Sequence, residues 1–126
     1  MRTAGIWPTR TALIAVVVDD AGRARPPIVL RRHDALPDLV AHLLEEIDSD
    51  VVVLDLSVRK LSSKRSALLT DARVWVAPQR TIDPIREACA LRPRAIAAML
   101  ARLPRVTAMR SLLHRHVVDP RQLTLL

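Results

Sequence analysis

Apolar residues in the first third of the chain form short runs that end in turn residues. The runs Ala4–Trp7 and Ala12–Val18 are followed by the turn segment 19–22 (DDAG) and then by Ile28–Leu30. Runs of this length, separated by turn signals, predict three strands in an antiparallel meander. Pro26 and Pro27 cannot donate ladder hydrogen bonds, so we expect the third strand to begin after them or to lie at an edge.

A helical period replaces the strand pattern after residue 33. Apolar residues recur at spacings of three and four, which predicts an amphipathic helix with Asp34 as a possible N-cap; they are Leu36, Leu39, Val40, Leu43, Leu44 and Ile47. The run Val51–Leu56 contains one acid, Asp55. A continuous β-branched run of this kind predicts a buried, parallel central strand.

The second half of the chain alternates less regularly. Residues 59–70 suggest a helix or a crossover, and 73–78 a short strand that a proline ends. The pattern from Ile82 to His114 is helical but contains Pro84, Pro93 and Pro104. Each proline suits a first helical turn, so we expect two or three short helices. The predicted order is β-β-β-α-β-α-β-α, an α/β domain over residues 1–116 with a tail over 117–126.

Length and composition narrow the class of protein. The chain has 126 residues, enough for one domain with a real core. No apolar run approaches the length of a membrane span, and the first residues lack a signal-peptide pattern, so we expect a cytoplasmic protein without a membrane partner. Cys89 is a lone cysteine, and no Cys/His set has zinc spacing, so no metal is expected.

The charge is strongly basic and unevenly distributed. The net charge is +7, and residues 1–79 hold 11 basic against 10 acidic groups, whereas residues 80–126 hold 9 basic against 3 acidic groups. This concentration favours a polyanion partner over a general arginine bias, although for any single arginine a solvated surface is the better interpretation. The residues predicted to meet nucleic-acid phosphates are Arg59, Lys60, Lys64, Arg65, Arg102, Arg105, Arg110 and Arg115.

The element order and two segments resemble the ribonuclease H-like fold. Residues 5–10 (GIWPTR) with Ala12–Val18 look like the first hairpin of Holliday-junction resolvases and DEDD-type transposases, and residues 51–55 (VVVLD) resemble their fourth strand. The resemblance implies a mixed sheet with a three-strand meander plus two parallel strands. In those families the first strand carries a metal-binding aspartate, but here Trp7 stands at that position. Indole cannot ligate a metal, so Asp55 is the only acid in the right place and no catalytic residue is favoured.

The chain ends in residues that look like a second known motif. Gln122, Leu123, Thr124, Leu125 and Leu126 resemble the bacterial sliding-clamp-binding pentamer. Such a peptide binds in extended form, its glutamine hydrogen-bonding the clamp while apolar side chains fill a pocket. A last strand, or a tail folded on the core, is the alternative interpretation.

Three hypotheses follow from these features. The first is a non-catalytic accessory protein of DNA replication, repair or recombination that docks on the sliding clamp and contacts DNA or a DNA-processing protein. The second is an active small metal-dependent nuclease, resolvase or transposase-like protein that uses Asp55 with Asp19 or Asp20, one helix acid (Asp83 or Glu87) and Mg²⁺. The third is an assembly subunit of a larger complex whose arginines pair with the acids of a protein partner. Only the second needs a cofactor.

Overall fold

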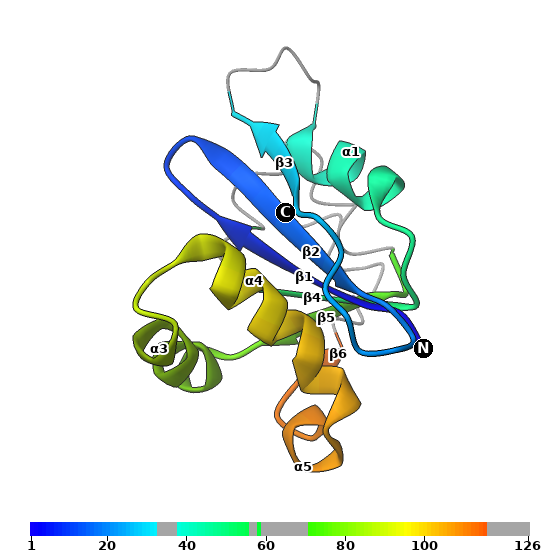
Figure 1. The fold of residues 1–126 in the computed structure, drawn as a ribbon, viewed down its shortest axis with the longest axis vertical. Helices are drawn as coiled ribbons and strands as arrows, with labels where there is room; N and C mark the ends of the chain where they lie inside the picture. Colours follow the sequence, from blue (N-terminus) through cyan, green and yellow to red (C-terminus); the bar gives the residue numbers. More distant parts are fainter. Residues whose placement is uncertain (33–37, 56–57, 59–70, 116–126) are drawn as a thin grey trace, which may run out of the picture.

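A central sheet lies between α1 on one face and α3 and α4 on the other (Figure 1). The computed structural model describes residues 1–32, 38–55, 58 and 71–115. The strands are β1 (Thr3–Pro8), β2 (Ala12–Val18), β3 (Ile28–Arg31), β4 (Val51–Asp55), β5 (Val74–Ala77) and β6 (His114–Arg115). The helices are α1 (Leu39–Glu46), α3 (Gln79–Ala88), α4 (Pro93–Arg102), the 3-10 helix η2 (Leu103–Arg105) and α5 (Thr107–Arg110).

The sheet is mixed, and its strand order within the described residues is β3-β2-β1-β4-β5-β6. β1, β2 and β3 form the antiparallel meander that the apolar runs predict. β4 joins β1 in parallel, and β5 joins β4 in parallel. The α/β class is therefore confirmed, as are the expected turn at residues 19–22 and the start of β3 after Pro27.

The two faces of the sheet alternate residue by residue, as the pleat requires. Ala4 and Ile6 of β1, with Val52 and Leu54 of β4, face α1. The intervening residues face α3 and α4, and Val51 and Val53 belong to that second core. Both cores consist mainly of aliphatic side chains, which explains how a chain without Phe or Tyr forms two buried layers.

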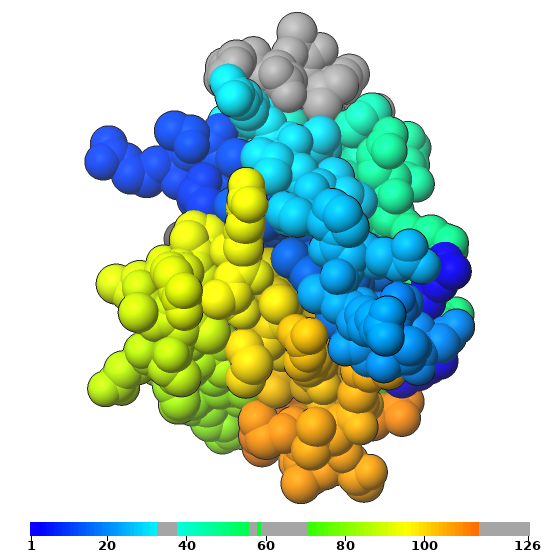
Figure 2. All heavy atoms as spheres, viewed as in Figure 1, coloured from blue at the N-terminus to red at the C-terminus, as the bar shows by residue number. Residues whose placement is uncertain are grey.

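Helix α4 lies directly across β1 and β2 (Figure 1). A Cβ on Gly5 would lie 2.1 Å from the carbonyl oxygen of Ala97 and 2.7 Å from the backbone nitrogen of Ala101. The two backbones can approach this closely only because β1 has a glycine here and α4 presents alanines. Figure 2, in the same view, shows α4 as a closed surface beside the β2–β3 segment, with α5 below it.

Three local predictions are wrong. The N-cap of α1 is Asp38 rather than Asp34, and its carboxylate accepts hydrogen bonds from the backbone N–H groups of Val40 and Ala41. Pro84 lies inside α3 rather than in a first turn, because Ile82 and Ile85 pack in one core cluster with Val51 and Val53 of β4 and this packing outweighs the lost hydrogen bond.

The third error concerns the end of the helical region. The pattern predicts helix as far as His114, but His114–Arg115 forms β6 and pairs antiparallel with Trp75 and Val76 of β5. The pairing satisfies backbone groups that β5 would otherwise present at an open edge. The expected helix or crossover at 59–70 lies outside the described residues.

Candidate functional site

The carboxyl ends of β1, β4 and β5 meet at one edge of the sheet. Ile6 pairs with Leu54, and Asp55 pairs with Ala77. The residues that follow Ile6 and Leu54 are Trp7 and Asp55, so these two lie side by side at the ends of neighbouring strands. Pleat alternation directs both toward the face of α3 and α4.

Trp7 is half-buried at this edge and contacts the core under α3 and α4. Arg86 of α3 lies over its ring, with the guanidinium carbon 5.8 Å from the ring centroid. A cation in this position is attracted by the negative face of the indole, which contributes about 0.5–1 kcal/mol at an exposed site. The edge therefore holds an arginine-covered indole beside one carboxylate.

The other acids named for a nuclease lie elsewhere. Val18 pairs with Thr3 at the opposite end of β1, and Asp19 and Asp20 follow Val18 in the turn. The length of β1, roughly 15–20 Å, therefore separates them from Asp55. Asp19 accepts backbone hydrogen bonds from Arg23 and Ala21, and these lower the pKa of its carboxyl. Asp20 pairs with the N-terminal amino group of Met1 at 2.6 Å.

No metal site emerges from the residues that the structure describes. Among them, no three His, Cys, Asp or Glu side chains are grouped so that they could hold a metal ion. The helix acid Asp83 accepts a hydrogen bond from the side-chain amide of Gln79 on the same helix. Asp55 thus shares the carboxyl edge with Trp7 rather than with the turn acids proposed as its partners.

The predicted phosphate-binding residues divide into three groups. Arg59, Lys60, Lys64 and Arg65 lie outside the described residues, and Arg115 takes part in β6 through its backbone. Arg105 donates to the backbone carbonyls of Met1 and Asp19 at 2.9 Å and to that of Asp20 at 3.4 Å. These contacts tie η2 to the N-terminus and the β2–β3 turn, so Arg105 has a structural role.

Arg102 and Arg110 have different surroundings. Arg102 donates to the carbonyl of Ala98 in its own helix at 3.3 Å. Arg110 is exposed and lies over Trp75 of β5, 5.9 Å from the ring centroid. Three of the arginines predicted to bind phosphate have side chains that the structure describes: Arg102, Arg105 and Arg110. Of these, Arg110 is the one best placed to meet an external anion. The pentamer Gln122–Leu126 lies outside the described residues.

Sequence reasoning missed both tryptophan–arginine pairs. Trp7 and Trp75 are the only aromatic residues of the chain, and both contact the core on the α3 and α4 face. The rarity of tryptophan in the sequence could have drawn attention to Trp7 and Trp75, but the sequence does not show which arginines lie over them. Only the placement of α3 and α5 against the sheet selects Arg86 and Arg110.

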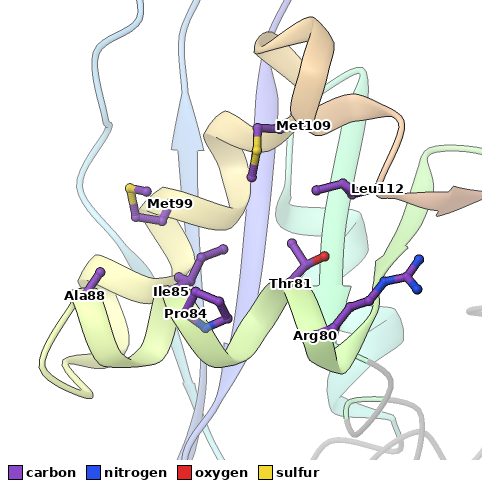
Figure 3. A pocket seen from close by; sticks show the side chains of 8 residues that line it. All are labelled: Arg80, Thr81, Pro84, Ile85, Ala88, Met99, Met109 and Leu112. Atoms are coloured by element: carbon purple, nitrogen blue, oxygen red, sulfur yellow. The ribbon is translucent and has the colours of Figure 1, made fainter.

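A second feature that the sequence did not reveal is an apolar groove of about 500 Å³ between α3 and the segment from α4 to Leu112 (Figure 3). Arg80, Pro84 and Ala88 form one wall, and Met99, Met109 and Leu112 form the other. Thr81 and Ile85 project into the space from α3.

Comparison with known proteins gives no match to a protein-family model or to a curated protein. Within the described residues, no helix is both long and apolar enough to cross a membrane.

Proposed function

We propose that this chain is a non-catalytic accessory protein of DNA maintenance, built on a ribonuclease H-like fold and acting in the cytoplasm. It docks on the bacterial sliding clamp through residues 122–126 and contacts DNA or a DNA-processing protein. The observation that carries the proposal is the register of β1 and β4, which places Trp7 beside Asp55 at the carboxyl edge. In the resembled nucleases this is where the strand carboxylates converge.

The sheet order supports this interpretation of the edge. The order β3-β2-β1-β4-β5, with an antiparallel meander and parallel β1, β4 and β5, is the arrangement expected of a ribonuclease H-like sheet. Two-metal cleavage needs several carboxylates around paired cations about 3.5–4 Å apart. An indole covered by Arg86 brings a positive charge to this place instead. The edge is therefore better suited to binding a phosphate than to cleaving its ester.

The docking half of the proposal is tested with the full chain and a purified bacterial sliding clamp. Removing residues 122–126 should weaken clamp binding at least tenfold in fluorescence anisotropy, because the pentamer supplies both the glutamine contact and the apolar anchors. Arg121→Ala, just outside the pentamer, is the matched control and should bind as the parent does. Equal affinity after the deletion, or no binding by the parent, overturns the docking claim.

The DNA half is tested by charge reversal. The double variant Lys64→Glu/Arg65→Glu should weaken binding to DNA of any sequence and flatten its salt dependence, because phosphate contacts position without specifying. Arg31→Glu/Arg32→Glu makes the same change in net charge on exposed residues near β3 and should bind more tightly than the first variant. If both variants lose the same DNA affinity, the loss is explained by net charge and not by contacts of Lys64 and Arg65. Parental DNA binding that is absent or insensitive to salt favours the assembly subunit.

Catalysis is tested on branched and linear DNA with Mg²⁺. The proposal predicts no cleavage by the parent or by Asp55→Asn. Cleavage by the parent that Asp55→Asn abolishes establishes the nuclease alternative and overturns the non-catalytic assignment.

A further inference from the structure

Three neighbouring strands place Asp55, Trp7 and Ile14 in one row at the carboxyl end of β1. Trp7 pairs with Ile14 across the antiparallel β1–β2 ladder, and the register of β1 and β4 puts Asp55 on the other side of Trp7. Residues that lie side by side on neighbouring strands point to the same face of a sheet, which here is the face of α3 and α4. Trp7 therefore lies between Ile14 and the carboxylate of Asp55.

A pocket of about 490 Å³ lies on the β2 side of this row. It is lined by Ile14 of β2 and by Arg92, Pro93, Arg94 and Ala95 at the start of α4. Figure 1 shows the start of α4 next to the tip of the β1 arrow. Ile14 packs with Ala97 of α4, and Trp7 contacts the same cluster, so the indole is a neighbour of the pocket. A volume of this size is typical of pockets that hold a small organic ligand.

Two arginines line this pocket, and a third lies over the neighbouring indole. Arg92 and Arg94 are exposed, and the guanidinium carbon of Arg86 lies 5.8 Å from the centroid of the Trp7 ring. The Nε–H group of Arg92 donates to the carbonyl of Cys89 at 3.3 Å, and its terminal nitrogens make no hydrogen bond with the described residues. Within the same residues, neither Arg86 nor Arg94 forms an ion pair. These guanidinium groups can therefore meet an external anion.

The acids at this end of the fold do not line the pocket. Asp55 lies on the far side of Trp7, and Asp83 accepts a hydrogen bond from a side-chain amide of its own helix. Glu87 follows Arg86 directly, which places it about 100° round α3 from that side chain. The pocket is therefore lined by positive charge alone, and it favours an occupant with negative charge.

The lining also indicates the class of anion. A guanidinium group presents planar, paired donors that match the oxygens of a phosphate. Apart from the two arginines, the lining consists of Ile14, Pro93 and Ala95, which have no hydrogen-bonding side chain. A bare phosphate ion leaves these apolar side chains in water, whereas the sugar and base of a nucleotide cover them. The pocket therefore matches a phosphate ester that carries a less polar group.

From the two arginines, the apolar lining and the position beside Trp7, we propose that this pocket binds one nucleotide. The phosphate lies at Arg92 and Arg94, and the sugar and base lie against Ile14 and Pro93. That the nucleotide belongs to a DNA strand rests on the proposed function. It is then an unpaired nucleotide, because a base that is stacked in a duplex cannot enter a pocket.

Indole N–H signals in NMR spectra of the full chain test the site and the source of the nucleotide together. The chain has two tryptophans, so the signal of Trp75, under Arg110, is the internal control for that of Trp7. The probes are a thymidine single strand of about 12 nucleotides, a duplex of the same length, thymidine monophosphate and inorganic phosphate.

We expect the single strand and thymidine monophosphate to shift the Trp7 signal saturably and to leave Trp75 unchanged. The single strand should bind at least fivefold more tightly than the duplex, because only its bases are free to enter the pocket. Inorganic phosphate should bind at least tenfold more weakly than thymidine monophosphate, because it gains nothing from the apolar lining.

Matched charge reversals locate the binding. Arg94→Glu should reduce the affinity for the single strand and for thymidine monophosphate at least tenfold. Arg23→Glu is the control, because Arg23 is also exposed but lies in the β2–β3 turn, at the opposite end of β1. It makes the same change in net charge and should reduce either affinity less than threefold. Melting temperatures near the parent's show that each variant is folded.

The outcomes separate this proposal from the proposed function. Equal losses in Arg94→Glu and Arg23→Glu, or saturation by the single strand without a shift of Trp7, overturn the nucleotide pocket and leave DNA binding to other residues. Inorganic phosphate that binds as tightly as thymidine monophosphate also overturns it, as does a preference for the duplex. A shift with thymidine monophosphate but no binding of the single strand supports the pocket and overturns its DNA source. Absence of binding by either probe overturns the pocket and the DNA contact together.

Discussion

The two faces of the sheet differ in how regular their packing is. On the α1 face, aliphatic side chains of β1, β2, β4 and β5 pack against Val40, Leu43, Leu44 and Ile47, and Arg73 closes the end of the helix. On the α3 and α4 face lie both tryptophans, a proline inside a helix, an open groove and the buried, unpaired hydroxyl of Thr81. Departures from local rules are expected where a protein acts on something else, so the comparison favours the second face as the one to test for binding.

The α3 and α4 face also contains a very close approach of two backbones at Gly5, and this gives the largest predicted effect. Gly5→Ala should destabilise the protein by about 3 kcal/mol or more, because its Cβ would overlap the backbone of α4 at Ala97 and Ala101. Gly22→Ala is the control: Gly22 has a φ of 81° but its Cβ would meet nothing closer than 3.9 Å. That change should cost about 1 kcal/mol. Urea unfolding of both variants measures the difference.

Equal losses for the two glycine variants contradict the close approach of α4 to β1. In that case the packing of α4 on β1 does not depend on Gly5, and the contrast between the two faces no longer holds.

The α1 face is held at its edge by Asp71 and Arg73, and this predicts a pH dependence. Arg73 donates to Asp71 at 2.9 Å and to the carbonyls of Leu44 and Ile47 at 2.8 Å, near the carboxyl end of α1. The hydrogen bond from Arg73 lowers the pKa of the Asp71 carboxyl below 3.8. A depressed pKa stabilises the fold above pH 3.8, and the contribution is lost as the pH falls through the folded-state pKa.

Asp71→Asn should therefore cost about 1 kcal/mol at pH 7, and its difference from the parent should shrink as the pH falls below 3.8. Asp48→Asn is the control. It removes an ion pair with Arg2, and because the Asp48 side chain is 88% exposed, the loss of stability should be much smaller at every pH. Thermal unfolding between pH 7 and pH 3 measures both. A difference for Asp71→Asn that does not change with pH contradicts the assigned role.

The smallest predicted change in stability concerns the buried hydroxyl of Thr81 on the α3 and α4 face. Thr81→Val keeps the shape and removes a buried hydroxyl without a partner, so it should leave stability unchanged or raise it by up to about 1 kcal/mol. Thr9→Val is the control, because the Thr9 hydroxyl accepts from the backbone N–H of Ala12 at 2.9 Å. The control should lose about 1 kcal/mol. A loss at Thr81 as large as at Thr9 means that its hydroxyl has a hydrogen-bond partner.

The sequence by itself determined where most elements lie. Apolar runs bounded by turn residues located β1, β2, β3 and β4 to within about a residue, because a strand needs only local alternation and a turn to end it. Trp7 and Asp55 were singled out by the resemblance to ribonuclease H-like proteins rather than by the apolar runs, and only the register of β1 and β4 shows that they are neighbours. The local patterns were wrong at Asp34, Pro84 and His114, where a competing cap, a buried helical face and a free strand edge each outweighed local preference.

Only the tertiary structure decided which residues act together. Arg86 lies over Trp7, and Arg105 donates to three backbone carbonyls more than 80 positions away in the chain, and no local pattern indicates either contact. The groove arises from helices whose separate sequences show nothing unusual. Local patterns encode the state of each segment, but contacts between distant segments depend on how closely α4 approaches the sheet, and that distance is set by Gly5.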